Sequence, residues 1–276
     1  MPGAARKIVK RVAAVLDVVA PPPPGITILI YHRVGRRSAI EVDLPAGLFA
    51  DQMAWLREHC DLVTLDEVLD RLPGPAPTDR SGEPRRPVVA VTFDDGTADF
   101  VSDALPVLTA HRVPVTLYVA TDFIERGRAF PDDGIPLSWA ALADAVSTGL
   151  VTVGSHTHTH ALLDRADPEA VCYELDRSCD LIATRLGVHA EHFAYPKAVP
   201  GSSLADREVR RRFRSAALAG TRPNAYGATD PYRLSRAPVQ FADDMAWFER
   251  KAAGGMRAED VVRRVVNRWR YRGKSS

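Results

Sequence analysis

The chain has 276 residues, of which 36 are basic and 35 acidic, so its formal net charge is +1. So balanced a charge gives no whole-chain attraction to nucleic acid, and we expect no nucleic-acid partner. Hydrophobic residues make up 46% and charged residues 26% of the sequence, which excludes a disordered or fibrous chain. The three cysteines lack the spacing of a metal site or a disulfide framework. The length fits a single α/β barrel.

The first 24 residues form a segment of their own, 1–24, which is basic and rich in proline. Four basic residues between positions 6 and 11 precede an apolar run over 12–20, as in a signal peptide. Asp17 interrupts that run, however, and four prolines follow where a small-residue cleavage site would stand. We therefore expect a short amphipathic helix that ends at the prolines, and a cytoplasmic protein. A signal peptide, and hence export, is the alternative.

Strand-like and helical segments alternate in residues 25–245, which we expect to form one folded domain. Apolar or β-branched runs predict strands over 26–31, 88–93, 115–120, 151–153 and 192–195. Helical spacing predicts helices over 49–56, 65–72, 103–111, 138–147 and 168–186, and a helix-to-strand transition over 209–218. Asp66 is the expected cap of the second helix and Ser138 that of the fourth. The alternation predicts a distorted, partly open (β/α)7 barrel, with a doubly wound sheet as the alternative.

Acidic or histidine residues follow three of the predicted strands. Asp94 and Asp95 come directly after the strand 88–93, and His32 closes the first strand. The sequence His156-Thr157-His158-Thr159-His160 follows the strand 151–153. Because the carboxyl ends of parallel strands meet at one rim, we expect these side chains to lie together. The structural alternatives are a turn for the two aspartates, a surface loop for the histidine cluster and a core position for His32.

A carboxylate with two histidines four residues apart fits a metal site that keeps open positions. Such a donor set suits zinc or another divalent first-row ion. Two adjacent carboxylates repel each other, so keeping both ionised favours a nearby cation. We expect the imidazoles of His156 and His160 to share one face of a helix or to lie on one side of a turn, and within a helical turn His158 would point elsewhere.

The segments Thr92–Gly96 and Ser155–His160 resemble the motifs of polysaccharide deacetylases with a nodulation-deacetylase homology domain, carbohydrate esterase family four. The resemblance extends over roughly residues 26 to 240. Residues 113–119 are similar to the third strand of that family, and residues 137–139 to its tryptophan-bearing helix start. Residues 193–196 are similar to its oxyanion-strand motif.

The resemblance implies a metal-dependent hydrolase that removes an N-acetyl group from a carbohydrate substrate and releases acetate. The substrate would be N-acetylglucosamine or another N-acetylated sugar in a polysaccharide, an oligosaccharide or a lipid-linked glycan. The resemblance further implies Asp95, His156 and His160 as ligands of one divalent ion, usually Zn²⁺, and Asp94 as the general base. Two other functions stay open: a deacylase or deformylase of a small amide, and a non-catalytic carbohydrate-binding relic.

The general acid of most family members is a histidine in a C-terminal Leu-x-x-His-Asp segment, and this chain has no histidine after His192. A circularly permuted branch that acts on exopolysaccharide carries this histidine in a Tyr-His motif on its first strand. Tyr31 and His32 match that motif, which implies His32 as the acid. Arg236 resembles a later arginine of the same branch and would orient Asp94. The alternative for Arg236 is a solvated side chain near a strand end.

The oxyanion motif also differs from the family's common pattern. Ala194 stands where the family has an arginine, and Lys197 follows Pro196 where the family prefers tyrosine. Since the backbone N–H after that proline binds the oxyanion in the family, Lys197 remains the expected donor. These differences affect the expected substrate more than the expected reaction.

The C-terminal segment 246–276 is strongly basic. From residue 250 onward it holds nine basic residues against Glu259 and Asp260, a local charge of +7. Val262, Val265, Val266 and Trp269 would share one face of a helix, so we expect a basic amphipathic helix. It would either pack on the barrel or dock peripherally on an anionic membrane surface. The sequence predicts no oligomeric state.

Overall fold

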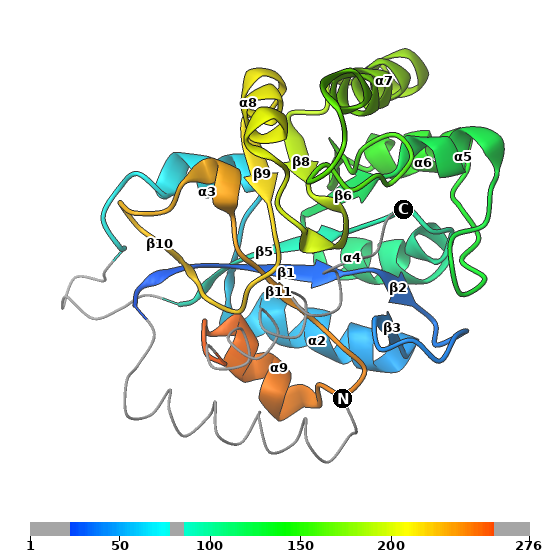
Figure 1. The fold of residues 1–276 in the computed structure, drawn as a ribbon. Helices are drawn as coiled ribbons and strands as arrows, with labels where there is room; N and C mark the ends of the chain where they lie inside the picture. The colour runs from blue at the N-terminus through cyan, green and yellow to red at the C-terminus, as the bar shows by residue number, and fades with distance from the viewer. Residues whose placement is uncertain (1–22, 78–85, 257–276) are drawn as a thin grey trace.

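In the computed structural model, residues 23–77 and 86–256 are described (Figure 1). Parallel strands in this part of the chain curl into a distorted, partly open (β/α)7 barrel, which confirms the predicted fold class. The barrel strands, in spatial order, are β1 (Gly25–Tyr31), β5 (Val88–Phe93), β6 (Val115–Val119), β7 (Val151–Ser155), β8 (His192–Ala194), β9 (Ser215–Ala217) and β11 (Arg236–Pro238).

The barrel is weakly joined between β9 and β11. Strand β11 is parallel to β1, with Ile28 opposite Arg236. Toward β9, by contrast, only the isolated bridge Ala217–Leu234 and a few backbone bonds connect the strands, among them Gly220 N to Arg236 O at 2.8 Å. This gap is the partly open side of the barrel.

Four short strands complete the sheet structure of the described residues. Strand β10 (Asn224–Ala225) is antiparallel to the start of β1, and β4 (Asp61–Leu62) pairs with the start of β5. Strands β2 (Arg33–Val34) and β3 (Asp43–Leu44) pair beyond the end of β1. The β2–β3 pair therefore borders the carboxyl-end rim, whereas β4 and β10 lie at the opposite end of the barrel.

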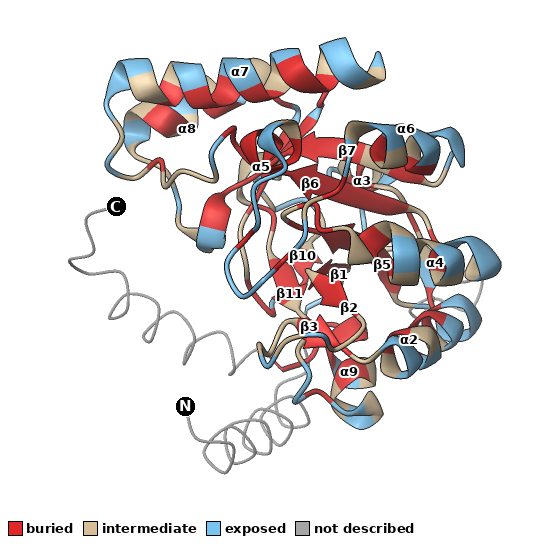
Figure 2. Ribbon diagram, turned by 90° about the vertical axis from the view of Figure 1, so that its right-hand side faces the viewer, coloured by how far each residue is buried: buried red, intermediate tan, exposed pale blue. Residues whose placement is uncertain are grey.

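Helices surround the sheet and turn their apolar faces toward it, as the red inner faces in Figure 2 show. They are α2 (Ala46–His59), α3 (Leu65–Arg71), α4 (Leu105–His111), α5 (Thr121–Arg126), α6 (Trp139–Ser147), α7 (Pro168–Leu186), α8 (Ser203–Arg212) and α9 (Met245–Ala252). A π-helical turn over Phe100–Ala104 precedes α4, so the predicted helix 103–111 begins irregularly. Helix α5 was not predicted from the sequence.

The helix caps agree with the sequence at one of the two predicted positions. Ser138 caps α6 by accepting a hydrogen bond from Ala141 N, as predicted. The prediction that Asp66 caps α3 is wrong, because Thr64 is the cap and forms a capping box with Glu67. Asp66 instead lies in the first helical turn, where the helix dipole favours a negative charge.

Two hydrophobic clusters lie on the two faces of the curled sheet. The larger one fills the space between the strands and the outer helices and includes Val91, Phe93 and Phe193. The smaller one lies inside the barrel and includes Ile28, Tyr118 and residues of α3, which closes the end opposite the rim. Strands buried on both faces explain the continuous apolar runs in the sequence.

Small residues inside the barrel make room for one large ring. Gly154 on β7 lies directly opposite Tyr118 on β6. A Cβ atom at Gly154 would come within 2.6 Å of Tyr118 Cδ1 and 2.8 Å of His192 O. A glycine is therefore required here to make room for the Tyr118 ring.

Only part of the two predicted terminal segments falls within the described residues. Residues 1–22, and with them nearly all of the segment 1–24, lie outside, as do the four apolar residues predicted to share a helix face at 262–269. In the C-terminal segment, α9 packs Phe248 edge-on against Trp55 of α2, with ring centroids 6.0 Å apart. Among the described helices, none combines the length and the hydropathy that a membrane span requires.

Candidate functional site

A tight turn after β5 carries two adjacent carboxylates. Asp95 and Gly96 both have left-handed backbone conformations, with φ of 73° and 95°. Asp94 N donates to Tyr31 O on β1 at 3.0 Å, which keeps Asp94 in line with the sheet. Asp94 is therefore buried at 5% exposure, whereas Asp95 is half-buried at the rim. The two adjacent carboxylates therefore differ in their exposure to water.

Arg236 reaches through the barrel interior and binds Asp94 with both ends of its guanidinium group. Its Nη1 and Nη2 lie 2.6 and 2.9 Å from the two carboxylate oxygens of Asp94. Nη1 also donates to Thr92 Oγ1 at 3.1 Å, and the guanidinium lies 4.9 Å from the centre of the Tyr118 ring. Arg236 is only 1% exposed, so the alternative of a solvated arginine at a strand end is wrong.

This pairing decides the charge of Asp94. Burial alone raises the pKa of Asp94, but the charges of Arg236 and His156, together with hydrogen bonds from Arg236, lower that pKa to about 2. Burial likewise disfavours the charge of Arg236, yet Asp94 raises the pKa of the guanidinium above its ordinary value. Asp94 is therefore a carboxylate throughout the physiological pH range, with a fixed orientation.

Three further donor groups converge next to this pair. The ligand atoms of Asp95, His156 and His160 all lie within 4.8 Å of one another. Asp95 Oδ1 is 3.7 Å from His156 Nε2 and 3.5 Å from His160 Nε2. His156 Nε2 also lies 3.9 Å from Asp94 Oδ2, so the donor group and the buried pair form one site.

The backbone after β7, which carries the histidines, is not helical. Thr157 and His160 have left-handed backbone conformations, each with a φ of 64°. The two imidazoles nevertheless lie on the same side, with ring centres 4.9 Å apart. The two imidazoles therefore lie on one side of a turn, as one of the two expectations had it, and the other expectation, a shared helical face, is wrong.

His158 points away from the other two histidines, as predicted, and is held by buried partners. Its Nδ1 lies 2.9 Å from Thr121 Oγ1, and its Nε2 lies 3.7 Å from Asp122 Oδ1. Burial lowers the pKa of His158, while the charge of Asp122 opposes that shift. His158 thus anchors the loop and is absent from the donor group.

The donor group fits a divalent ion by its chemistry and by its spacing. His156 Nδ1 is 2.8 Å from Ala194 O, which fixes Nδ1 as the protonated nitrogen and leaves the lone pair of Nε2 toward the other donors. Desolvation lowers the pKa of His160 to about 4, so its imidazole is in the neutral, ligating form at neutral pH. Ligand atoms about 2.0–2.1 Å from a tetrahedral zinc ion lie about 3.3 Å apart. The observed spacings of 3.5 and 3.7 Å are close to that value.

The structure places the two remaining predicted residues near this site. His32 is half-buried directly after β1, and its charge contributes to the low pKa of Asp94. Its Nδ1 is buried and has no hydrogen-bond partner among the described residues. Lys197 has a left-handed backbone conformation, with φ of 53°, and its charge contributes to the low pKa of His160.

Several residues that shape the site were missed by sequence reasoning. Thr92 and Tyr118 hold the guanidinium of Arg236, and the carbonyl of Ala194 orients His156. Thr92 lies within the recognised segment Thr92–Gly96, which is the only signal that could have identified it. A backbone carbonyl leaves no trace in residue identity, and Tyr118 resembles any other core aromatic.

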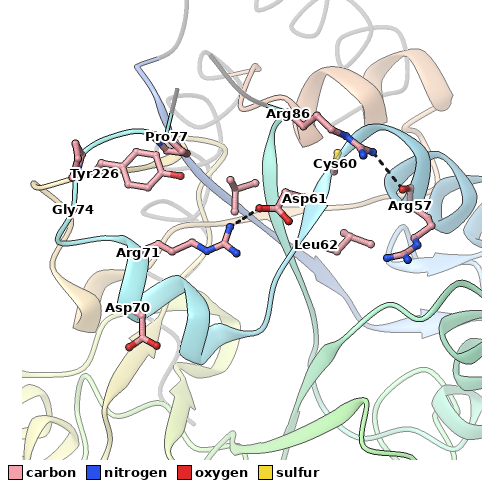
Figure 3. Close-up of a pocket in the computed structure, with 12 residues that line it drawn as sticks. Arg57, Cys60, Asp61, Leu62, Asp70, Arg71, Gly74, Pro77, Arg86 and Tyr226 are labelled. Carbon is pink, nitrogen blue, oxygen red and sulfur yellow. Dashed lines mark hydrogen bonds and ion pairs between the residues drawn. The ribbon is translucent and has the colours of Figure 1, made fainter. Parts of the chain in front are cut away.

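A large cavity among the described residues lies away from this site. It has a volume of about 860 Å³ and lies at the start of β4 and β5, the opposite end of the barrel. Figure 3 shows Arg71 reaching toward Asp61 across this cavity, at an Nη1–Oδ2 distance of 2.5 Å. None of the predicted site residues lines it. A smaller hollow of about 170 Å³, which includes Arg33, lies beside the rim.

Comparisons with known proteins agree with this arrangement. A family model described as polysaccharide deacetylase matches residues 81–216, which include both aspartates and all three clustered histidines. IcaB from Ammonifex degensii is similar in structure, with a TM-score of 0.70 and 26% identity over 84% of this chain and 98% of its own. The deacetylase PplD from Streptococcus pyogenes, solved in complex with acetate, has a TM-score of 0.67 and 23% identity over 79% and 94% of the two chains.

The deacetylase domain of BpsB from Bordetella bronchiseptica is similar at a TM-score of 0.61, with 18% identity over 78% of this chain and 96% of its own. At this identity the likeness concerns the fold alone. Among curated protein sequences, none matches this chain. His32 and Arg236 lie outside the residues that the family model matches, and both act on Asp94, Arg236 through hydrogen bonds and His32 through its charge.

Proposed function

We propose that the chain is a member of the polysaccharide deacetylase family, and that it is a metal-dependent enzyme that removes the N-acetyl group from an N-acetylated sugar. One observation carries this proposal. A carboxylate locked by Arg236, Asp94, lies 3.9 Å from one member of a converging Asp95–His156–His160 donor group. A fixed proton acceptor beside three metal-type ligands is what metal-assisted hydrolysis of an amide requires.

We assign Asp95, His156 and His160 to hold one divalent ion, with Zn²⁺ as the best match to two imidazoles and a carboxylate. Such an ion would polarise the acetyl carbonyl and acidify the attacking water. The hydrogen bond from His156 Nδ1 to Ala194 O supports this assignment, because ligating histidines are typically oriented through their second nitrogen.

In this proposal Asp94 accepts the proton of the attacking water. With a pKa of about 2, Asp94 is ionised at every physiological pH, so it is always available as an acceptor. The same low pKa makes it a weak base, which therefore depends on an acidified water molecule. Arg236 acts as the positioning residue, since its two hydrogen bonds fix the carboxylate in one orientation.

His32 is the proposed general acid, and Lys197 the proposed oxyanion donor through its backbone N–H. Water adds its oxygen to the acetyl carbon, the C–N bond breaks, and the amide nitrogen takes a proton from His32 as it leaves as a free amine. Acetate and the amino sugar are the products. The proximity of His32 to Asp94 and of Lys197 to His160 supports both roles, because each acts on the pKa of its neighbour.

The proposal is tested by measuring acetate release from N-acetylglucosamine oligomers before and after treatment with a chelator. We expect release by the untreated protein, loss with the chelator and recovery when zinc is added back. Asp133→Asn serves as a control variant and should release acetate as the wild type does. Asp133 is an exposed carboxylate near the rim, and asparagine tolerates its left-handed conformation. Hydrolysis of small N-acyl amides but of no saccharide would contradict the sugar assignment. Failure to hydrolyse either class would indicate a binding relic.

A further inference from the structure

The two histidines of the donor group are held in place by different means. His156 is oriented directly, through the 2.8 Å hydrogen bond between its Nδ1 and Ala194 O. The His160 imidazole makes no comparable side-chain hydrogen bond within the described ranges, and its Nε2 lies 3.5 Å from Asp95. The direction of the His160 ring therefore depends on its backbone, which has a φ of 64°. A left-handed conformation is costly for a non-glycine residue, so it needs support from its surroundings.

That support comes from a carboxylate on a helix distant in sequence. Glu174 on α7 accepts hydrogen bonds from His158 N at 2.9 Å and Thr159 N at 2.8 Å, both through Oε2. Its other oxygen, Oε1, accepts a hydrogen bond from the Thr159 hydroxyl at 2.7 Å. Glu174 is only 6% exposed, and a buried carboxylate makes strong, charge-assisted hydrogen bonds. One buried carboxylate thus binds both residues that precede His160.

Two other contacts hold the same loop from the opposite side. Asp122 N donates to His158 O at 2.8 Å, and His158 Nδ1 lies 2.9 Å from Thr121 Oγ1. On the far side of His160, Ala161 N donates to Thr157 Oγ1 at 3.1 Å. With these contacts the loop is restrained around His158, and Glu174 supplies the restraint adjacent to His160.

We propose that Glu174 is a positioning residue of the metal site, which sets the direction of the His160 ligand by clamping the backbone of His158 and Thr159. This inference rests on the proposed function, because it assumes that His160 ligates the ion. Groups that orient a metal ligand usually change metal affinity about 10- to 100-fold when removed. Since His156 has its own orienting partner, loss of Glu174 should weaken the site without abolishing it.

The test measures the zinc affinity of the folded, metal-free full chain by competition with a chromogenic chelator. A second measurement is the rise in melting temperature that zinc causes. We expect Glu174→Ala to weaken zinc binding about 10- to 100-fold. Glu174→Gln keeps an acceptor for the two backbone N–H groups, so it should restore affinity close to that of the wild type. Asp180→Asn is the matched control, because it removes one carboxylate from an exposed position of the same helix.

A purely structural role for Glu174 would lower the melting temperature of the metal-free protein and leave zinc affinity unchanged in the folded fraction, and that result would overturn the proposal. If Glu174→Ala fails to fold, Thr159→Val tests the proposal instead. This variant removes only the hydrogen bond to Oε1 of Glu174, and Thr159 is exposed, so the protein should still fold. We expect a loss of about two- to tenfold in zinc affinity for that variant, and no loss would contradict the inference. Equal zinc binding by the wild type and His156→Ala would instead refute the proposed metal site itself.

Discussion

Both ends of the barrel bring aspartate and histidine together, but only one of them has the properties of a reactive site. At the end opposite the rim, His192 begins β8, Ser215 begins β9 and Asp66 lies in α3. His192 Nδ1 is 2.9 Å from Ser215 Oγ, and His192 Nε2 is 3.5 Å from Asp66 Oδ1. By residue type alone, this cluster resembles a nucleophilic Ser-His-Asp arrangement.

The two clusters differ in their exposure to solvent and in whether their side chains converge on one point. His192 and Ser215 are both 0% exposed, so no substrate can reach the serine. At the rim, the side chains of Asp95 and His160 are 20% and 23% exposed, and three ligand atoms point toward a common centre. The comparison teaches that the same residue types stabilise the fold at one end of the strands and can bind a ligand at the other.

The largest effect is expected for the ligand at the centre of the rim cluster. Asp95→Ala removes the oxygen that faces both imidazoles, so metal binding and deacetylation should be lost together. Zinc content by atomic absorption and acetate release are the two measurements. Full zinc content in Asp95→Ala would show that Asp95 is not a metal ligand, and metal binding would then not distinguish the two clusters in the proposed way.

Substitution of the neighbouring carboxylate, Asp94, should lower the rate of deacetylation without reducing metal binding. Asp94→Asn removes the proton acceptor but leaves all three ligands, so zinc content should persist while acetate release falls about 100-fold or more. Asn can still accept a hydrogen bond from Arg236, so the buried guanidinium keeps a partner. Zinc loss equal to that of Asp95→Ala would contradict the division of roles between the two aspartates.

The proposed acid should affect poor leaving groups more than good ones. His32→Ala removes the group that protonates the departing amide nitrogen, whereas an activated aryl ester departs without protonation. We expect a large decrease in amide hydrolysis, a small one in ester hydrolysis and no change in zinc content. Comparable decreases on both substrates would assign His32 a structural role, like that of His192.

The smallest effect on function is expected at the opposite end of the barrel. Burial lowers the pKa of His192, so His192 stays neutral in the native state but is protonated in the unfolded chain below its ordinary pKa of about 6.5. The native state is therefore stabilised above that pH, and this stability is lost as the pH falls below about 6.5.

His192→Gln should flatten this part of the pH dependence of the free energy of unfolding. The variant should also lower the free energy of unfolding at neutral pH by about 1–3 kcal/mol, because Ser215 Oγ loses its partner. Zinc affinity and the rate per folded molecule should stay unchanged. Urea unfolding at several pH values measures the effect, with the exposed His189→Gln as control. A loss of zinc affinity would mean that the two ends of the barrel are coupled.

Local sequence determined the helices and strands of this protein and the segments that form its candidate site. The apolar run 88–93 became β5 with the predicted bounds, and Pro168–Leu186 became α7 with a left-handed Gly187 at its end. Such elements follow from side-chain periodicity and backbone preferences, which act over a few residues. The two aspartates and the clustered histidines were recognisable for the same reason, since each group lies within one short segment.

Only the tertiary structure decided how these segments are held. Arg236 binds Asp94 across a sequence separation of 142 residues, and the pairing exists because β11 returns beside β1. Glu174 binds the backbone of a loop 16 residues away, directly before the left-handed residue His160. Charge pairing and backbone strain of this kind arise when distant strands and helices are brought into contact, and no local pattern records them.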